Sequence, residues 1–327
     1  MAVSRKRRSL LLATMVIFAA LAVAAAAALY GIDRTADVEA TPTGSTPAAS
    51  AVTKSSAESA PNPLLVPGIE HVHMGDSYAA GTGPYNLVEG APIPCQRTTV
   101  NPGRLLSKRM HWRTRDVACA SAKTENLYIE QYFGAGPQLD ALSARTRVVT
   151  SVLGANDEDF FDTLVTTCAK LGDTDPSGSP CRDAYETQFR AQLTRSTGPN
   201  LRKAYLDIAA KAPNARIFAV GYPWLVPAEQ ACRPSMRFAD GDIAFAREMQ
   251  ALLNAQVKAA VEGAGGTFVD MAEGSEGHDA CESSDVRWIE PAYDETGAPT
   301  GLPANHPNAR GQAAMAQALE QAIRRQR

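Results

Sequence analysis

Short apolar runs alternate with longer amphipathic stretches along the chain after residue 67. Apolar runs rich in β-branched residues are typical of buried parallel strands, and amphipathic stretches between them are typical of crossover helices. The pattern predicts strands at residues 70–74, 115–119, 148–153, 216–221 and 267–271. It predicts helices at residues 102–110, 138–144, 184–212, 242–263 and 309–325. This alternation predicts an α/β fold with a mostly parallel, five-stranded sheet.

The pattern before residue 68 is different. Residues 1–9 include a basic segment, residues 10–32 are almost wholly apolar, and residues 33–67 are rich in Ser, Thr, Ala and Pro. A basic segment before an apolar one indicates export, and this one is long enough to span a bilayer. We expect a transmembrane anchor, with a signal peptide cleaved near residues 24–28 as the alternative. After this segment we expect a disordered tether at residues 33–67 and a folded domain at residues 68–327.

The cysteines and the charge narrow the classes of protein further. Six cysteines occur at wide spacings without a Cys-x-x-Cys pair, which disfavours zinc ribbons and thioredoxin-like sites. In an exported domain they are expected to form disulfides, with the pairing left open. The net charge of −3 argues against a nucleic-acid partner held by phosphate contacts.

The candidate chemistry begins at Gly75-Asp76-Ser77, directly after the first predicted strand. A serine on a sharp turn at this edge of a parallel sheet exposes its hydroxyl in the crevice where such sheets bind ligands. The tripeptide is common in ordinary turns, so other segments must support the assignment. We therefore treat Ser77 as a candidate nucleophile.

Two later segments end at the same edge of the predicted sheet. Asn156 follows the apolar run 147–153, so its amide could donate a hydrogen bond to an oxyanion, although it could also cap a turn. His306 precedes Pro307 at the start of the last predicted helix. The positive end of a helix favours neutral imidazole, which can accept a proton. Alternatively, His306 is a surface residue that caps this helix.

Ser77, Asn156 and His306, in this order, resemble the motifs of the GDSL or SGNH hydrolase superfamily, and specifically its secreted actinobacterial lipase/esterase branch. The similarity extends over about residues 66–327 and includes Gly221-Tyr222-Pro223 and Gly277-His278-Asp279. The resemblance implies a flavodoxin-like, three-layer α/β/α sandwich. It also implies that Ser77 is the nucleophile, His306 the general base and Asn156 an oxyanion-hole donor, together with the Ser77 N–H.

The chain departs from the family pattern at two positions. Ser121 occupies the place of a glycine whose N–H completes the oxyanion hole, and a serine keeps this N–H. Pro303 occupies the place of the usual aspartate, three residues before the histidine. The resemblance allows a dyad in which a backbone carbonyl orients the histidine, and we expect the Pro303 carbonyl to do so. An acid from a nearby loop (Asp285, Glu290 or Asp294) is the alternative.

The resemblance also implies sequential disulfides. The implied pairs are Cys95–Cys119, Cys168–Cys181 and Cys232–Cys281. No cofactor is expected. His71 and His73 share a strand face, but the sequence shows no third ligand, so we expect no metal site.

Together these features predict an extracytoplasmic, monomeric serine esterase or lipase. Its expected partners are an ester substrate (a lipid, an acylated sugar or an envelope glycolipid) and the membrane, through the N-terminal segment. One alternative is an enzyme of the cell envelope that either transfers acyl groups or hydrolyses esters of glycolipids or carbohydrates. A non-catalytic surface module that binds glycan or lipid is an alternative of another class.

Overall fold

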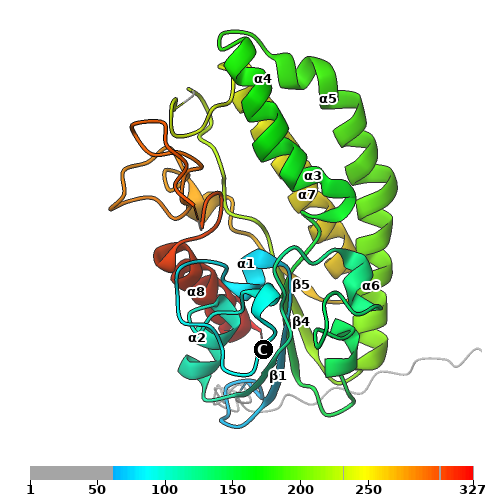
Figure 1. Cartoon of the computed structure of the whole chain (residues 1–327). Coiled ribbons are helices and arrows are strands. Elements are labelled where there is room, and N and C mark those ends of the chain that lie inside the picture. Colours follow the sequence, from blue (N-terminus) through cyan, green and yellow to red (C-terminus); the bar gives the residue numbers. More distant parts are fainter. Residues whose placement is uncertain (1–61, 231, 302, 327) are drawn as a thin grey trace, which may run out of the picture. The chain divides into compact units, whose positions relative to one another are not determined.

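The computed structural model of this chain describes residues 62–230, 232–301 and 303–326 (Figure 1). One sheet of five parallel strands has the order β2-β1-β3-β4-β5. The strands are β1 (Glu70–Gly75), β2 (Arg113–Asp116), β3 (Val148–Val152), β4 (Arg216–Val220) and β5 (Thr267–Val269). All five overlap a predicted strand, although β2 begins two residues earlier than expected and ends three residues earlier. This order confirms the flavodoxin-like fold and places its ligand crevice beyond β1 and β3, where the winding reverses.

Helices cover both faces of the sheet. In Figure 1, α2 (Pro102–Met110) and α8 (Ala309–Arg325) lie on one side of the strands, and α6 (Gly198–Lys211) and α7 (Asp242–Gly263) lie on the other. A second group of helices extends above α6 and packs against α7. It comprises α3 (Phe160–Asp162), the π-helical η5 (Thr163–Thr167), α4 (Cys168–Thr174) and α5 (Pro180–Ala191). The result is the predicted three-layer sandwich.

Three of the five predicted helices, at 102–110, 242–263 and 309–325, are confirmed. The helix expected at 138–144 is wrong, because only a 3₁₀ turn, Gln138–Ala141, forms there. The single helix expected at 184–212 is also wrong. α5 and α6 are separated by a π-helical segment, Gln192–Thr197, and Pro199 in the first turn of α6 has no N–H to continue regular α-helical bonding.

The end of β1 is shaped by a glycine. Gly75 has φ +126°, and a β-carbon there would lie 1.9 Å from the Val152 carbonyl oxygen of β3. Only glycine allows both this backbone conformation and this close approach. The chain therefore turns sharply into the short helix α1 (Ser77–Ala80). The Gln138 side chain fixes the turn further, because it accepts a hydrogen bond from the Gly75 N–H (2.7 Å) and donates one to the Gly75 carbonyl (3.0 Å).

The packed domain begins before residue 68, which corrects the expected end of the tether. Asn62 Nδ2 donates to the Ile323 carbonyl at the end of α8 (2.9 Å), and Leu64 is buried in the core. The segments expected at 1–9 and 10–32, and most of the tether, lie outside the described residues. Within the described ranges, no helix is both long enough and apolar enough to cross a bilayer.

Three disulfides link the domain, with the pairing that the family resemblance implies. They are Cys95–Cys119, Cys168–Cys181 and Cys232–Cys281. The first joins the loop after α1 to the segment after β2, next to Ser121. The second joins α4 to α5. Each closes a loop in the unfolded chain and so stabilises the fold, typically by about 2–4 kcal/mol.

Candidate active site

Three separate loops bring Ser77, Asn156 and His306 to the carboxyl edge of the sheet. Ser77 is the first residue of α1, directly after β1, and it is 7% exposed. Asp76 caps this helix, because its Oδ1 accepts a hydrogen bond from the Tyr78 N–H (2.9 Å). Asn156 follows β3, and His306 lies three residues before the first residue of α8.

Ser77 and His306 are in direct contact. His306 Nε2 lies 2.8 Å from Ser77 Oγ, and His306 Nδ1 lies 2.7 Å from the Ala304 carbonyl oxygen. A carbonyl oxygen only accepts hydrogen bonds, so Nδ1 carries the proton and Nε2 is free to accept one from the serine. Burial lowers the pKa of His306 below its ordinary value, and the bond to Ala304 opposes this shift. The imidazole is therefore neutral at neutral pH, as a general base must be.

The expectation that the Pro303 carbonyl orients His306 is wrong. That carbonyl accepts the backbone N–H of His306 (2.8 Å), and the ring is held by Ala304 instead. The difference arises at Asn305, which has the left-handed conformation, with φ +60°. This turn directs the Ala304 carbonyl toward the His306 ring.

None of the three candidate carboxylates has a hydrogen bond to the His306 ring in the part of the chain that the structure describes. The Glu290 carboxylate bonds to Asn308 Nδ2 (2.9 Å) and forms an ion pair with Arg287 (2.7 Å). Asp285 and Asp294 are exposed and accept hydrogen bonds from neighbouring hydroxyls, which lower the pKa of each carboxyl. The orienting group is thus a neutral carbonyl.

The loops that carry Ser121 and Asn156 are bonded to each other. Asn156 Nδ2 donates to the Ala122 carbonyl (3.1 Å), which leaves its second N–H free for a ligand. Asp157 accepts two hydrogen bonds from Thr124, from its N–H (2.8 Å) and its hydroxyl (2.7 Å). Among the described residues, the N–H groups of Ser77 and Ser121 have no hydrogen-bond partner. Three donors, from segments that follow β1, β2 and β3, are therefore available to a ligand at the carboxyl edge of the sheet.

Comparisons with known proteins agree with this geometry. The model of the GDSL-like Lipase/Acylhydrolase family matches residues 73–314, which include Ser77, Ser121, Asn156 and His306. The chain belongs to this family. It is a carboxylic ester hydrolase.

Relatives of this GDSL hydrolase come from Streptomyces. Lipase 2 of Streptomyces coelicolor is 38% identical over 81% of this chain and 89% of its own length. Phospholipase A1 of Streptomyces albidoflavus NA297 has the same fold, with a TM-score of 0.65 and 24% identity over 78% of this chain and 99% of its own. The extracellular lipase of Streptomyces rimosus is similar, with a TM-score of 0.63 and 23% identity over 78% of this chain and 100% of its own.

A small apolar cavity in this GDSL hydrolase is lined by Tyr78, the residue after the serine, although neither Ser77 nor His306 lines it. Its walls come from α1, the segment 155–164, the chain after β4, and α7. Tyr78, Phe161 and Leu164 are among its lining residues, and its volume is about 10 Å³. That is room for about one water molecule, so an acyl chain can enter only if these side chains move.

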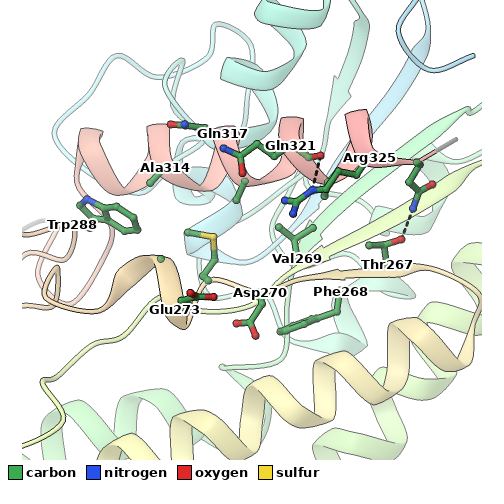
Figure 2. A pocket seen from close by; sticks show the side chains of 15 residues that line it. Thr267, Phe268, Val269, Asp270, Glu273, Trp288, Ala314, Gln317, Gln321 and Arg325 are labelled. Carbon is green, nitrogen blue, oxygen red and sulfur yellow. Dashed lines mark hydrogen bonds between the residues drawn. The ribbon is translucent and has the colours of Figure 1, made fainter. Parts of the chain in front are cut away.

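A much larger cavity, of about 1000 Å³, lies elsewhere, between β5 and α8 (Figure 2). Trp288, Asp270 and Gln321 are among the residues that line it. Neither Ser77 nor His306 does. The candidate catalytic site is therefore located by the Ser77–His306 contact and not by cavity size.

The paired histidines of β1 have structural partners. The ring nitrogens of His71 contact the hydroxyls of Thr114 (2.9 Å) and Thr150 (2.7 Å), and those of His73 contact Thr150 (2.7 Å) and the Ala79 carbonyl (2.9 Å). Burial lowers the pKa of both side chains. Both rings are therefore neutral, and one of them holds the end of α1.

The sequence analysis missed two groups that hold this site together. Ala304 carries the orienting carbonyl, and the only signal in the sequence was Asn305, because asparagine adopts the left-handed conformation more readily than most residues. Gln138 clamps Gly75 through both atoms of its amide. Nothing in the local sequence pattern indicates this contact, because the two residues are distant along the chain.

Proposed function

We propose that this protein is an extracytoplasmic serine esterase or lipase that works through a Ser77–His306 dyad and an acyl-enzyme. The observation that carries the proposal is the 2.8 Å contact between His306 Nε2 and Ser77 Oγ, combined with the Nδ1 contact to a carbonyl. Together they define a base whose free nitrogen faces the nucleophile. That is the arrangement a hydroxyl needs to become nucleophilic at neutral pH.

In the proposed reaction, His306 takes the proton of Ser77 as Oγ attacks the ester carbonyl. The N–H groups of Ser77 and Ser121 and the Asn156 amide stabilise the oxyanion. His306 then protonates the departing alcohol, which leaves an acyl group on Ser77. The same histidine next removes a proton from water, which attacks the acyl carbon; the bond to Ser77 Oγ breaks, the acid leaves, and His306 returns the proton to Ser77.

The Ala304 carbonyl holds the imidazole in the reactive tautomer throughout these steps. A neutral carbonyl stabilises the transient imidazolium less than a carboxylate does, because hydrogen bonds to ionised acceptors are roughly twice as strong. The dyad therefore relies on orientation and on the oxyanion donors more than on charge.

The proposed substrate is a carboxylic ester with a short acyl group. The small cavity that Tyr78 lines, one residue after Ser77 in the sequence, has no room for a long chain in its present shape. The names of the Streptomyces relatives, which include lipases and a phospholipase A1, support an acyl ester. Three disulfides support a site outside the cytoplasm, as does the export signal that the sequence predicts. Retention of the N-terminal segment as a membrane anchor remains a prediction.

Covalent labelling tests the proposal. A fluorophosphonate should label the wild-type protein and the S284A variant, in which an exposed serine distant in sequence is removed, and it should fail to label S77A. H306A should be labelled very slowly, and both S77A and H306A should lose p-nitrophenyl acetate hydrolysis. Wild-type turnover by folded S77A would show that the nucleophile is elsewhere. No labelling of the folded wild-type protein would favour a binding module.

A further inference from the structure

Tyr222 follows β4 and belongs to none of the loops that carry Ser77, Asn156 and His306, yet its hydroxyl bonds to Asp76 and Ala155, the residues before Ser77 and Asn156. The Asn254 side chain, from α7, holds its main chain on both sides, accepting from the Tyr222 N–H (2.8 Å) and donating to the Tyr222 carbonyl (3.0 Å). The Tyr222 side chain is 2% exposed. A rigid helix on the far side of the sheet therefore fixes the position of this phenol.

The phenol oxygen joins two of the catalytic loops. It donates to Asp76 Oδ2 (2.5 Å), next to the nucleophile, and it accepts from the Ala155 N–H (3.0 Å), next to Asn156. Asp76 in turn caps α1 through its other oxygen. The donor and an acceptor site of the hydroxyl are thus both used between the nucleophile turn and the loop that carries the amide.

A second tyrosine makes a parallel connection. The hydroxyl of Tyr78, in α1, donates to the Asn305 carbonyl (2.7 Å), one residue before His306. The rings of Tyr78 and Tyr222 pack edge to face, with their centroids 5.2 Å apart. One hydroxyl thus connects the nucleophile helix to the histidine loop, and the other connects the nucleophile turn to the Asn156 loop.

We propose that Tyr222 is a positioning residue that holds Asn156 at the distance from Ser77 at which its amide can bind the oxyanion. This inference rests on the proposed function, specifically on the role of Asn156. The Gly154 backbone, at φ +122°, has no side chain to restrain the loop where it leaves β3. The bond from the Ala155 N–H to the phenol supplies that restraint.

A double-mutant cycle tests the proposal with Y222F and N156A. Y222F keeps the buried ring and removes only the hydroxyl. We expect it to lower kcat by about 10²-fold, the effect of a displacement of roughly 1 Å in a catalytic group, with KM nearly unchanged. N156A should lower kcat by about 10²–10³-fold. In the N156A background Y222F should have little further effect, because the amide that it positions is absent.

Y78F is the matched control, because it also removes one buried hydroxyl and keeps the ring. Its effect should multiply with that of N156A, since Tyr78 acts on the histidine loop. Circular dichroism and thermal unfolding identify variants that fail to fold. If Y222F is one of them, N254A, which releases the Tyr222 main chain, replaces it in the same cycle with the same expectation.

The outcomes distinguish a failure of the positioning role of Tyr222 from a failure of the proposed function. If the reductions in kcat caused by Y222F and N156A multiply fully in the double variant, the positioning role is overturned and the proposed function stays intact. An increase in KM that depends on acyl chain length, with kcat unchanged, would also overturn it and make Tyr222 only a wall of the cavity. Wild-type turnover by N156A would overturn both this inference and the oxyanion role of Asn156.

Discussion

The substitution E290Q separates a dyad from a triad most directly. Glu290 lies in the loop that contacts the histidine segment, since its N–H donates to the His306 carbonyl (3.0 Å) and its carbonyl accepts from the Asn305 N–H (2.8 Å). Its carboxylate, however, is bonded to Asn308 and Arg287. The substitution of an amide for this carboxylate removes the negative charge from the loop that contacts the His306 segment. It leaves the size of the side chain unchanged.

The expected effect on catalysis is small because the His306 ring is held by Ala304. We expect kcat/KM to remain within about tenfold of wild type, or about 1.4 kcal/mol of barrier. The stability effect is also modest. The Arg287 pair is partly exposed, with 22% of each side chain accessible, so its loss should cost about 1 kcal/mol. For a domain of this size, that lowers Tm by about 2–4 °C.

The assay is p-nitrophenyl butyrate hydrolysis, with thermal unfolding of each variant measured in parallel. E295Q, at an exposed acid in the same region, is the control for a change in net charge, and H306A provides the inactive reference. A fall of about 10⁴-fold in folded E290Q, the size of effect seen when a true triad acid is neutralised, would refute the dyad.

Three further predictions follow from the same geometry. Since burial lowers the pKa of His306 and the base must be neutral, kcat/KM should fall on acidification only below about pH 6.5, the ordinary pKa of histidine. A fall of kcat/KM that is centred near pH 7, the raised pKa of Asp76, would instead be assigned to Asp76. S121G keeps the backbone N–H at this position and removes the strain of a serine in the left-handed conformation (φ +62°). Thermal unfolding should therefore show stability unchanged or raised by up to about 1 kcal/mol, with activity within about tenfold of wild type. A loss of activity of about 10²-fold would mean that the Ser121 hydroxyl contributes to catalysis. L164A enlarges the small cavity that Tyr78 lines and should raise the kcat/KM ratio of octanoate to acetate esters. L171A, at a residue that does not line this cavity, should leave that ratio unchanged, and an unchanged ratio in L164A would place the acyl chain elsewhere.

The sequence by itself determined the positions of the strands, three of the long helices and the candidate catalytic residues. Each of these depends on local information. The strands follow from short apolar runs, α2, α7 and α8 from continuous periodicity, and Ser77 and Asn156 from turn residues directly after apolar runs. Parallel strands then bring their carboxyl ends to one edge of the sheet without further information. The family resemblance added the roles of the residues and the disulfide pairing.

Only the tertiary structure decided which groups serve the catalytic pair. Ala304 replaces Pro303 as the orienter because Asn305 adopts a left-handed turn, which its contacts with Tyr78 and Glu290 hold in place. Residues 138–144 do not form the expected helix, and the Gln138 amide instead clamps Gly75.

The link through Tyr222 was equally absent from the local pattern. It joins Asp76 to Ala155 from a strand end more than 60 residues away from either. Hydrogen bonds between distant segments depend on where folding places the backbone, and no periodicity or turn preference records that placement. A sequence pattern can therefore identify candidate catalytic residues, whereas the residues that hold them in position emerge only when the strands and helices are packed together.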